Sequence, residues 1–233
     1  MINVLLAGVG GQGTVLAAKV LASAAQARGW QVRTAETIGM AQRGGNVTSH
    51  VRMGSDGEEV FSSLITPGTA EMVIALEPGE AARALPYLAP GGVLVTATTA
   101  IQPVTAALAG QPYHAGTVVA NLANSLQSEA LTEAAASVAQ RAFRNDTVED
   151  TQAPGVEGYP VPLFVPVDDA ALERQLGPGS RKSLNMMLLA VAVAQNRIPL
   201  TLDEVKQAVE ACVKPQFVAM NLTAIDHAAE AYG

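Results

Sequence analysis

The chain has 233 residues, of which 49% are hydrophobic and 15% charged, and its formal net charge is −7. This apolar content excludes a disordered chain, and the length fits one domain, because single cores usually stop growing near about 250–300 residues. The acidic balance disfavours a nucleic-acid-binding protein, which needs clustered Lys and Arg.

The cysteine count limits the redox chemistry of the chain. Cys212 is the single cysteine, so no internal disulfide can form, and an iron–sulfur cluster, which needs about four thiolates, cannot be held by this chain alone. The three histidines are too scattered to indicate zinc. No secretory signal and no membrane-spanning apolar run is visible, so the sequence predicts a cytoplasmic protein.

The first forty residues show the clearest pattern. A short apolar run at 4–7 predicts a buried strand, residues 8–13 form a glycine-rich turn, and 14–28 predict an alanine-rich helix that ends before Gly29. A second strand is expected at 31–35. This order of strand, glycine turn, helix and strand is typical of a nucleotide-fold βαβ unit.

The rest of the chain continues as an α/β protein. Further strands are predicted at 47–53, 71–76, 93–96 and 161–167, a turn at 90–92, and helices at 78–88, 117–143, 168–176, 180–195, 201–213 and from 215 onward. Residues 145–162 look like a long loop, which is unusual inside a compact domain. We therefore predict a Rossmann-like, mostly parallel sheet flanked by helices, with a helical C-terminal part. It forms a single domain over 1–233, with an insertion or extended connection at about 113–160.

The glycine turn has the spacing of a dinucleotide-binding motif. Gly8, Gly10 and Gly13 would allow close backbone approach, and the following helix would present free N–H groups to a phosphate. Glu36 ends the second predicted strand, where a ribose-binding acid would be. Helix–strand packing explains the same glycines equally well. A Walker-type phosphate loop is disfavoured, since Thr14 replaces its lysine.

Residues 43–46, with the sequence Arg-Gly-Gly-Asn, form a second polar loop. Arg43 beside exposed amides could clamp an anion or a partner, whereas the alternative is a turn with a solvent-facing arginine. Three other residues favour structural interpretations. His50 is expected to be a surface or cross-strand residue, Cys212 a small buried hydrophobe, and Glu77 an acid at a helix start.

Together these segments resemble a known family. Residues 8–14 (Gly-Val-Gly-Gly-Gln-Gly-Thr) and 36–45, which include Gln42-Arg43-Gly44-Gly45, are similar to the gamma-type domain of 2-oxoacid:ferredoxin (acceptor) oxidoreductases. The strongest likeness is to its indolepyruvate branch, in the small (beta) subunit. Later stretches that agree are 47–52, 70–81, 85–92, 183–186 and 214–222. Residues 113–159 have no counterpart in this likeness.

The resemblance implies a role in oxidative decarboxylation. Such enzymes convert an aryl pyruvate such as indolepyruvate, coenzyme A (CoA) and oxidised ferredoxin to an aryl-acetyl-CoA, CO2 and reduced ferredoxin. Their thiamine diphosphate (TPP) and iron–sulfur clusters are expected in a larger partner subunit, since this chain lacks the cysteines and a Gly-Asp-Gly signature. Ferredoxin would be met through the complex, and the isolated chain is expected to form a homodimer and to be inactive.

The resemblance also implies which residues face the partner or a phosphate-bearing ligand such as CoA, with no catalytic or metal-binding residue in this chain. These are Gly8, Gly10, Gly11, Gln12, Gly13, Thr14, Gln42, Arg43, Gly44, Gly45 and Asn46. Two alternatives stay open. One is a self-sufficient NAD(P)- or flavin-binding Rossmann oxidoreductase, and the other is a scaffold without a ligand.

Overall fold

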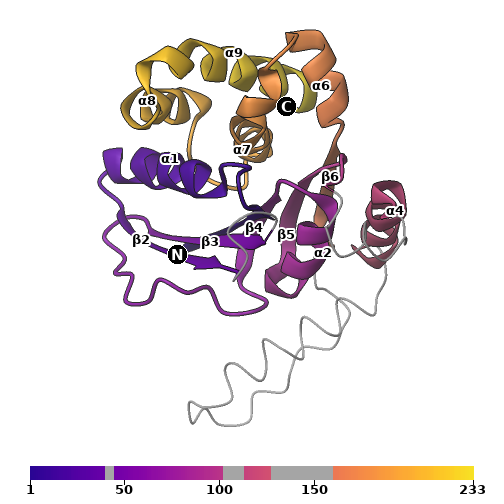
Figure 1. Cartoon of the computed structure of the whole chain (residues 1–233). Helices are drawn as coiled ribbons and strands as arrows, with labels where there is room; N and C mark the ends of the chain where they lie inside the picture. Colours follow the sequence, from indigo (N-terminus) through magenta and orange to yellow (C-terminus); the bar gives the residue numbers. More distant parts are fainter. Residues whose placement is uncertain (40–44, 102–112, 127–159) are drawn as a thin grey trace.

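A computed structural model describes residues 1–39, 45–101, 113–126 and 160–233 (Figure 1). In this part of the chain six strands form one sheet in the order β2-β3-β1-β4-β5-β6. The strands are β1 (Ile2–Val9), β2 (Gln31–Ile38), β3 (Asn46–Gly54), β4 (Ala70–Ala75), β5 (Leu88–Ala97) and β6 (Leu163–Val167).

The sheet is mixed, with one reversed strand among the six. Strands β1, β4, β5 and β6 pair in parallel, while β3 is antiparallel both to β1 and to β2. Strand β2 therefore runs in the same direction as β1 but is separated from it by β3. The predicted mostly parallel sheet is confirmed, and the position of β3 is a feature that the strand pattern alone did not reveal.

Helices cover both faces of the sheet. On one face, at the top of Figure 1, lie α1 (Thr14–Ala27), α7 (Leu184–Ala194), α8 (Leu202–Cys212) and α9 (Pro215–Tyr232). On the other face lie α2 (Pro78–Ala84) and α4 (Ala115–Leu126), with the 3-10 turn η1 (Leu85–Tyr87) between α2 and β5. Helix α6 (Asp169–Leu176) and the 3-10 turn η2 (Ser180–Ser183) connect β6 to α7.

The larger core lies on the face of α1 and α7. All residues from Leu184 to Val193 are buried, because α7 packs against α1, α9 and the sheet at once. Strand alternation divides the remaining side chains between the faces. Val4 and Leu6 point into this larger core, whereas Leu5 and Ala7 point to the smaller core beneath α2 and α4.

Several element boundaries differ from the sequence prediction. The predicted turn at 90–92 lies inside β5, where Gly91 has φ +70° and the pairing with β4 shifts register. The helix predicted at 78–88 is α2 followed by η1, because Pro86 cannot donate the next helical hydrogen bond. The helix predicted from Ser180 begins as the 3-10 turn η2.

Other predictions are confirmed, or lie outside the described residues. Thr201 and Glu204 form the predicted capping box of α8, and α9 starts at Pro215. Helix α4 confirms the beginning of the helix predicted at 117–143, whereas its remainder and nearly all of the loop predicted at 145–162 lie outside the described residues. None of the helices in the described ranges combines the length and the apolar character that a bilayer crossing requires.

Candidate functional site

The glycine turn lies where ligands bind in open α/β sheets. It follows β1 and leads into α1 on one face, while the neighbouring parallel strand β4 leads into α2 on the opposite face. The ends of β1 and β4 thus form a topological switch point, the position at which such sheets open a crevice. The sequence motif is therefore placed where its chemistry would need it.

The side chain of Gln12 crosses this switch point. The Val9 amide donates to Gln12 Oε1 over 2.6 Å, and Gln12 Nε2 donates to the carbonyl of Leu76 over 2.8 Å, at the end of β4. The Gln12 amide in turn donates to the Val9 carbonyl over 3.1 Å. Gln12 thus ties the ends of two strands together, and the amides of Val9 and Gln12 are already engaged within the protein.

Packing explains two of the motif glycines. Gly13 has φ +85°, and a Cβ there would lie 2.6 Å from Nδ2 of Asn185, which donates to the Gly13 carbonyl over 3.0 Å. A Cβ on Gly8 would lie 2.7 Å from Oγ1 of Thr14. The Thr14 hydroxyl is buried and has no hydrogen-bond partner among the described residues. Gly8, Gly13 and Thr14 therefore hold α1 against β1 and α7.

The end of the second motif meets the glycine turn. The Gly10 amide donates to the carbonyl of Gly45 over 2.9 Å, and the Gly39 amide donates to the carbonyl of Asn46 over 2.8 Å. The structure thus brings Gly45 and Asn46, at the end of the second motif, beside Gly10. The predicted clamp residues Gln42, Arg43 and Gly44 lie outside the described residues.

The acid expected to bind a ribose is in the wrong place. In a dinucleotide fold this acid ends the strand beside β1, but here β3 lies between β1 and β2. Glu36 is exposed and pairs across the sheet with Ser49 of β3. The interpretation as a dinucleotide site therefore lacks its ribose contact, and the side chain of Gln12 is hydrogen-bonded across the switch point.

A groove of about 460 Å³ opens on the outer side of the turn. Gly10, Gly11 and Gln12 line one side, and Ile101, Arg181, Lys182 and Leu184 line the other. The two cations come from η2, far from the turn in the sequence. Sequence reasoning missed them; the available signal was an Arg-Lys pair between the 177–179 Gly-Pro-Gly segment and an apolar helix.

Two carboxylates fix the first of these cations, and the second is unpaired. Arg181 Nη1 lies 2.8 Å from Glu173 Oε1 and 3.6 Å from Oδ2 of the fully buried Asp169. Asp169 Oδ1 also accepts from the amides of Thr98 and Thr99 beyond β5. Lys182 is exposed and forms no ion pair with any residue in the described ranges. The groove therefore offers an uncompensated positive charge beside the glycine turn.

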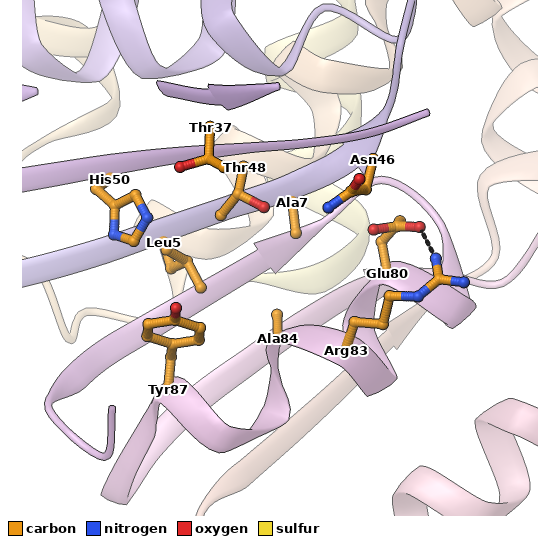
Figure 2. A pocket seen from close by; sticks show the side chains of 10 residues that line it. All are labelled: Leu5, Ala7, Thr37, Asn46, Thr48, His50, Glu80, Arg83, Ala84 and Tyr87. Atoms are coloured by element: carbon orange, nitrogen blue, oxygen red, sulfur yellow. Dashed lines mark hydrogen bonds and ion pairs between the residues drawn. The ribbon is translucent and has the colours of Figure 1, made fainter. Parts of the chain in front are cut away.

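A second cavity, of about 200 Å³, lies on the α2 face of the sheet (Figure 2). Its lining residues come from β1, β2, β3, α2 and η1. They are Leu5, Ala7, Thr37, Asn46, Thr48, His50, Glu80, Arg83, Ala84 and Tyr87. Asn46, one of the residues implied by the resemblance, thus lines this cavity, while its carbonyl accepts from the amide of Gly39 at the end of β2.

His50 is not a surface residue, contrary to one of the two sequence expectations. It is 4% exposed, Nδ1 accepts from the Ile65 amide over 3.2 Å, and the Tyr87 ring stands edge-on at 5.7 Å. The loop carrying Ile65 and the turn η1 cover a position that strand alternation left to solvent. Burial lowers the pKa of His50, which favours the neutral ring.

Acidic residues at the start of α2 are buried beside this cavity. Glu77 caps the helix by accepting from the Glu80 amide over 3.1 Å, which confirms the predicted helix start. Glu80 is bound by Arg83, and its side chain is 5% exposed against 66% for Arg83. Burial raises the pKa of Glu80, and the charge of Arg83 opposes this shift.

The chain belongs to the pyruvate ferredoxin/flavodoxin oxidoreductase family, whose family model matches residues 3–231. This match includes both glycine motifs, the strands that carry them and the helical C-terminal part. The family thus agrees with the class indicated by the resemblance, and the alternative of a self-sufficient dinucleotide-dependent oxidoreductase is not supported.

Two curated relatives share the name of a subunit of indolepyruvate oxidoreductase. The protein of Thermococcus kodakarensis named indolepyruvate oxidoreductase subunit IorB is 41% identical over 102 residues, which span 44% of this chain and about half (49%) of that relative. The protein of the same name from Pyrococcus horikoshii is 27% identical over 224 residues, covering 96% of this chain and 92% of that relative.

A solved structure supports the fold. The 2-oxoglutarate:ferredoxin oxidoreductase of Magnetococcus marinus, determined with 2-oxoglutarate, coenzyme A and succinyl-CoA bound, matches all of this chain with a TM-score of 0.61. The identity is 16%, so the match concerns the fold alone. The chain covers only 31% of that protein, in which this fold is one part of a longer polypeptide.

Proposed function

We propose that this chain is the small subunit of a 2-oxoacid:ferredoxin oxidoreductase that acts on indolepyruvate or another aryl pyruvate in a CoA-dependent oxidative decarboxylation. The observation that carries the proposal is the alignment over 96% of the chain with a relative named as an indolepyruvate oxidoreductase subunit. The family match over residues 3–231 supports it.

The redox cofactors of such an enzyme do not fit this chain. An iron–sulfur cluster needs about four thiolates, and the sequence contains one cysteine. Within the described ranges no three His, Cys, Asp or Glu residues are grouped as metal ligands. We therefore assign TPP and the clusters to a larger partner subunit, through which ferredoxin would be reduced. The Magnetococcus marinus enzyme supports this division, because most of its chain lies outside the shared fold.

The groove beside the glycine turn is the place we propose for a phosphate group of CoA. Lys182 supplies an unpaired positive charge, and Arg181 is held in position by Asp169 and Glu173. Gly10 and Gly11 add no side chains to the groove, so an anion could approach the backbone closely at these two residues. We also propose that 113–160 is an insertion in the single domain, and that the isolated chain forms a homodimer.

Two measurements test this function. Affinity purification of the full chain from its native cells, followed by mass spectrometry, should recover a partner of several hundred residues with ferredoxin-like cysteine spacing. The reconstituted complex should oxidise indolepyruvate with CoA and ferredoxin, whereas the isolated chain should not. Turnover by the isolated chain, or the absence of any such partner, would contradict the proposal.

The CoA groove has its own test in the reconstituted complex. The substitution Lys182→Glu should weaken CoA binding by about tenfold or more, because it replaces an attractive charge by a repulsive one next to the phosphate. Lys214→Glu, also at an exposed lysine but at the start of α9, serves as the matched control. Calorimetry giving equal CoA affinities for both variants would reject the groove and leave the subunit assignment intact.

A further inference from the structure

The cavity on the α2 face contains groups that the proposed function does not use. Its floor is apolar, formed by Leu5 and Ala7 of β1 with Ala84 of α2 opposite, and the remaining lining is polar (Figure 2). Its volume of about 200 Å³ equals the space of roughly seven water molecules. The cavity is therefore large enough for a small organic molecule and too small for a nucleotide.

His50 presents one fixed hydrogen-bond donor to this cavity. Because Nδ1 accepts from the Ile65 amide, the proton of the neutral ring must reside on Nε2. Nε2 makes no hydrogen bond to any other residue of the described part, and the ring lines the cavity. A buried neutral histidine in this tautomer can donate to an oxygen atom without introducing a charge.

The accessible charge of the cavity is positive. Glu80 and Arg83 form an ion pair, but the carboxylate is buried and the guanidinium is 66% exposed. Near this pair Figure 2 shows the side-chain amide of Asn46. The hydroxyls of Thr37 and Thr48 also line the cavity, and neither bonds to another residue that the structure describes. Donors thus outnumber unengaged acceptors, and a single exposed cation favours an anion of charge −1.

We propose that this cavity binds a small monocarboxylic acid anion. The carboxylate accepts hydrogen bonds from the guanidinium of Arg83 and from the side-chain amide of Asn46, and a short apolar body lies on Ala7 and Leu5 and extends toward the ring of His50 (Figure 2). Neither the subunit assignment nor the CoA groove is needed for this site, which lies on the other face of the sheet from α1. A multiply charged phosphate fits less well, because the buried Glu80 carboxylate would repel it.

The test uses the full chain and a matched pair of probes, isovalerate and its uncharged isostere isovaleramide. Isovalerate should bind saturably and shift the ring signals of His50 in two-bond 1H–15N spectra, and isovaleramide should bind at least tenfold more weakly. The double substitution Glu80→Gln/Arg83→Met removes the Glu80 carboxylate together with its cationic partner and should weaken isovalerate binding by about tenfold. Arg174→Met, at an exposed arginine of α6, should leave the affinity unchanged.

Three results would overturn the proposal. They are the absence of saturable binding of isovalerate and of the larger acid benzoate, equal affinities for isovalerate and its amide, and unchanged isovalerate affinity in the double variant. Should the double variant not fold, Thr48→Val keeps the test decisive, because it removes one lining hydroxyl at nearly constant volume. This variant should bind isovalerate about threefold more weakly, and an unchanged affinity would count against the site.

Discussion

The glycine turn and the His50 cavity lie on either side of β1, and they differ in what their polar groups do. In the turn, the amides of Val9, Gly10 and Gln12 and both ends of the Gln12 side chain are bonded within the protein. In the cavity, Nε2 of His50 and the hydroxyls of Thr37 and Thr48 make no bond to the described residues. The glycine turn, which has the stronger sequence motif, therefore has more of its polar groups hydrogen-bonded within the protein than the cavity has.

This difference shows that a motif and a binding capacity need not coincide. A buried polar group that is already paired gains little from a ligand, whereas an unpaired one gains a hydrogen bond that it otherwise lacks. The glycine turn combines both situations. Its inner side joins the ends of β1 and β4 through hydrogen bonds, and only its outer side opens on the groove that Lys182 lines. Four further experiments test this difference between the turn and the cavity.

The largest effect is expected from Gly13→Ala. The residue has φ +85°, which costs an alanine about 1–2 kcal/mol, and the new Cβ would lie 2.6 Å from Nδ2 of Asn185. Displacing this packed side chain adds about 1–3 kcal/mol, so unfolding in urea should reveal a total loss of about 2–5 kcal/mol. Gly11→Ala is the control, since its φ is +101° but nothing lies within 4 Å; equal losses would contradict the packing role of Gly13.

A smaller loss of stability is expected from Gln12→Ala. The substitution removes the two hydrogen bonds that join the ends of β1 and β4, each contributing about 1 kcal/mol. The free energy of unfolding should therefore fall by about 2 kcal/mol. Gln26→Ala, at an exposed position of α1, should change it by less than about 0.5 kcal/mol. If Gln12→Ala were equally neutral, the hydrogen bonds of Gln12 would not stabilise the junction of β1 and β4. A role of the turn in ligand contact would then gain support.

Much of the fold could be predicted because local signals and tertiary structure agree. The apolar run of β1, the glycine turn, and the Thr201–Glu204 capping box each predict an element that the structure contains. The insertion of β3 between β1 and β2 could not be predicted, because alternation indicates the faces of a strand and not its neighbours. The misplacement of Glu36 follows directly from that missing information.

The candidate site was predictable only in part, for a related reason. The turn itself was found, but Arg181 and Lys182 reach it from the other end of the chain, and no local pattern links them to Gly10. His50 could not be recognised as buried, since the loop at Ile65 and the ring of Tyr87 cover it only after folding. Both features depend on contacts between residues that lie far apart in the sequence, and residue type alone does not reveal such contacts.

The smallest effect, and the one that tests the cavity most directly, is the pH dependence of stability that His50 confers. Burial lowers its pKa below the ordinary value of about 6.5, so the unfolded chain binds the proton more readily than the folded one. The stabilisation is complete above the unfolded value and is lost as the pH falls through the folded pKa. Urea unfolding should therefore show a loss between pH 7 and 5 that is reduced in His50→Gln and retained in His114→Gln, at an exposed histidine.

The charged and titratable groups around this ring make the experiment specific. Tyr87 faces the ring, and the Glu80–Arg83 pair lines the same cavity. The raised pKa of Glu80 acts in the opposite direction, because its stabilisation is lost as the pH rises, so the difference between wild type and His50→Gln isolates the histidine. A carboxylate bound in the cavity would favour the charged ring and raise the pKa of His50. An NMR titration that gives the same His50 pKa with and without saturating isovalerate would show that the anion does not bind beside this ring.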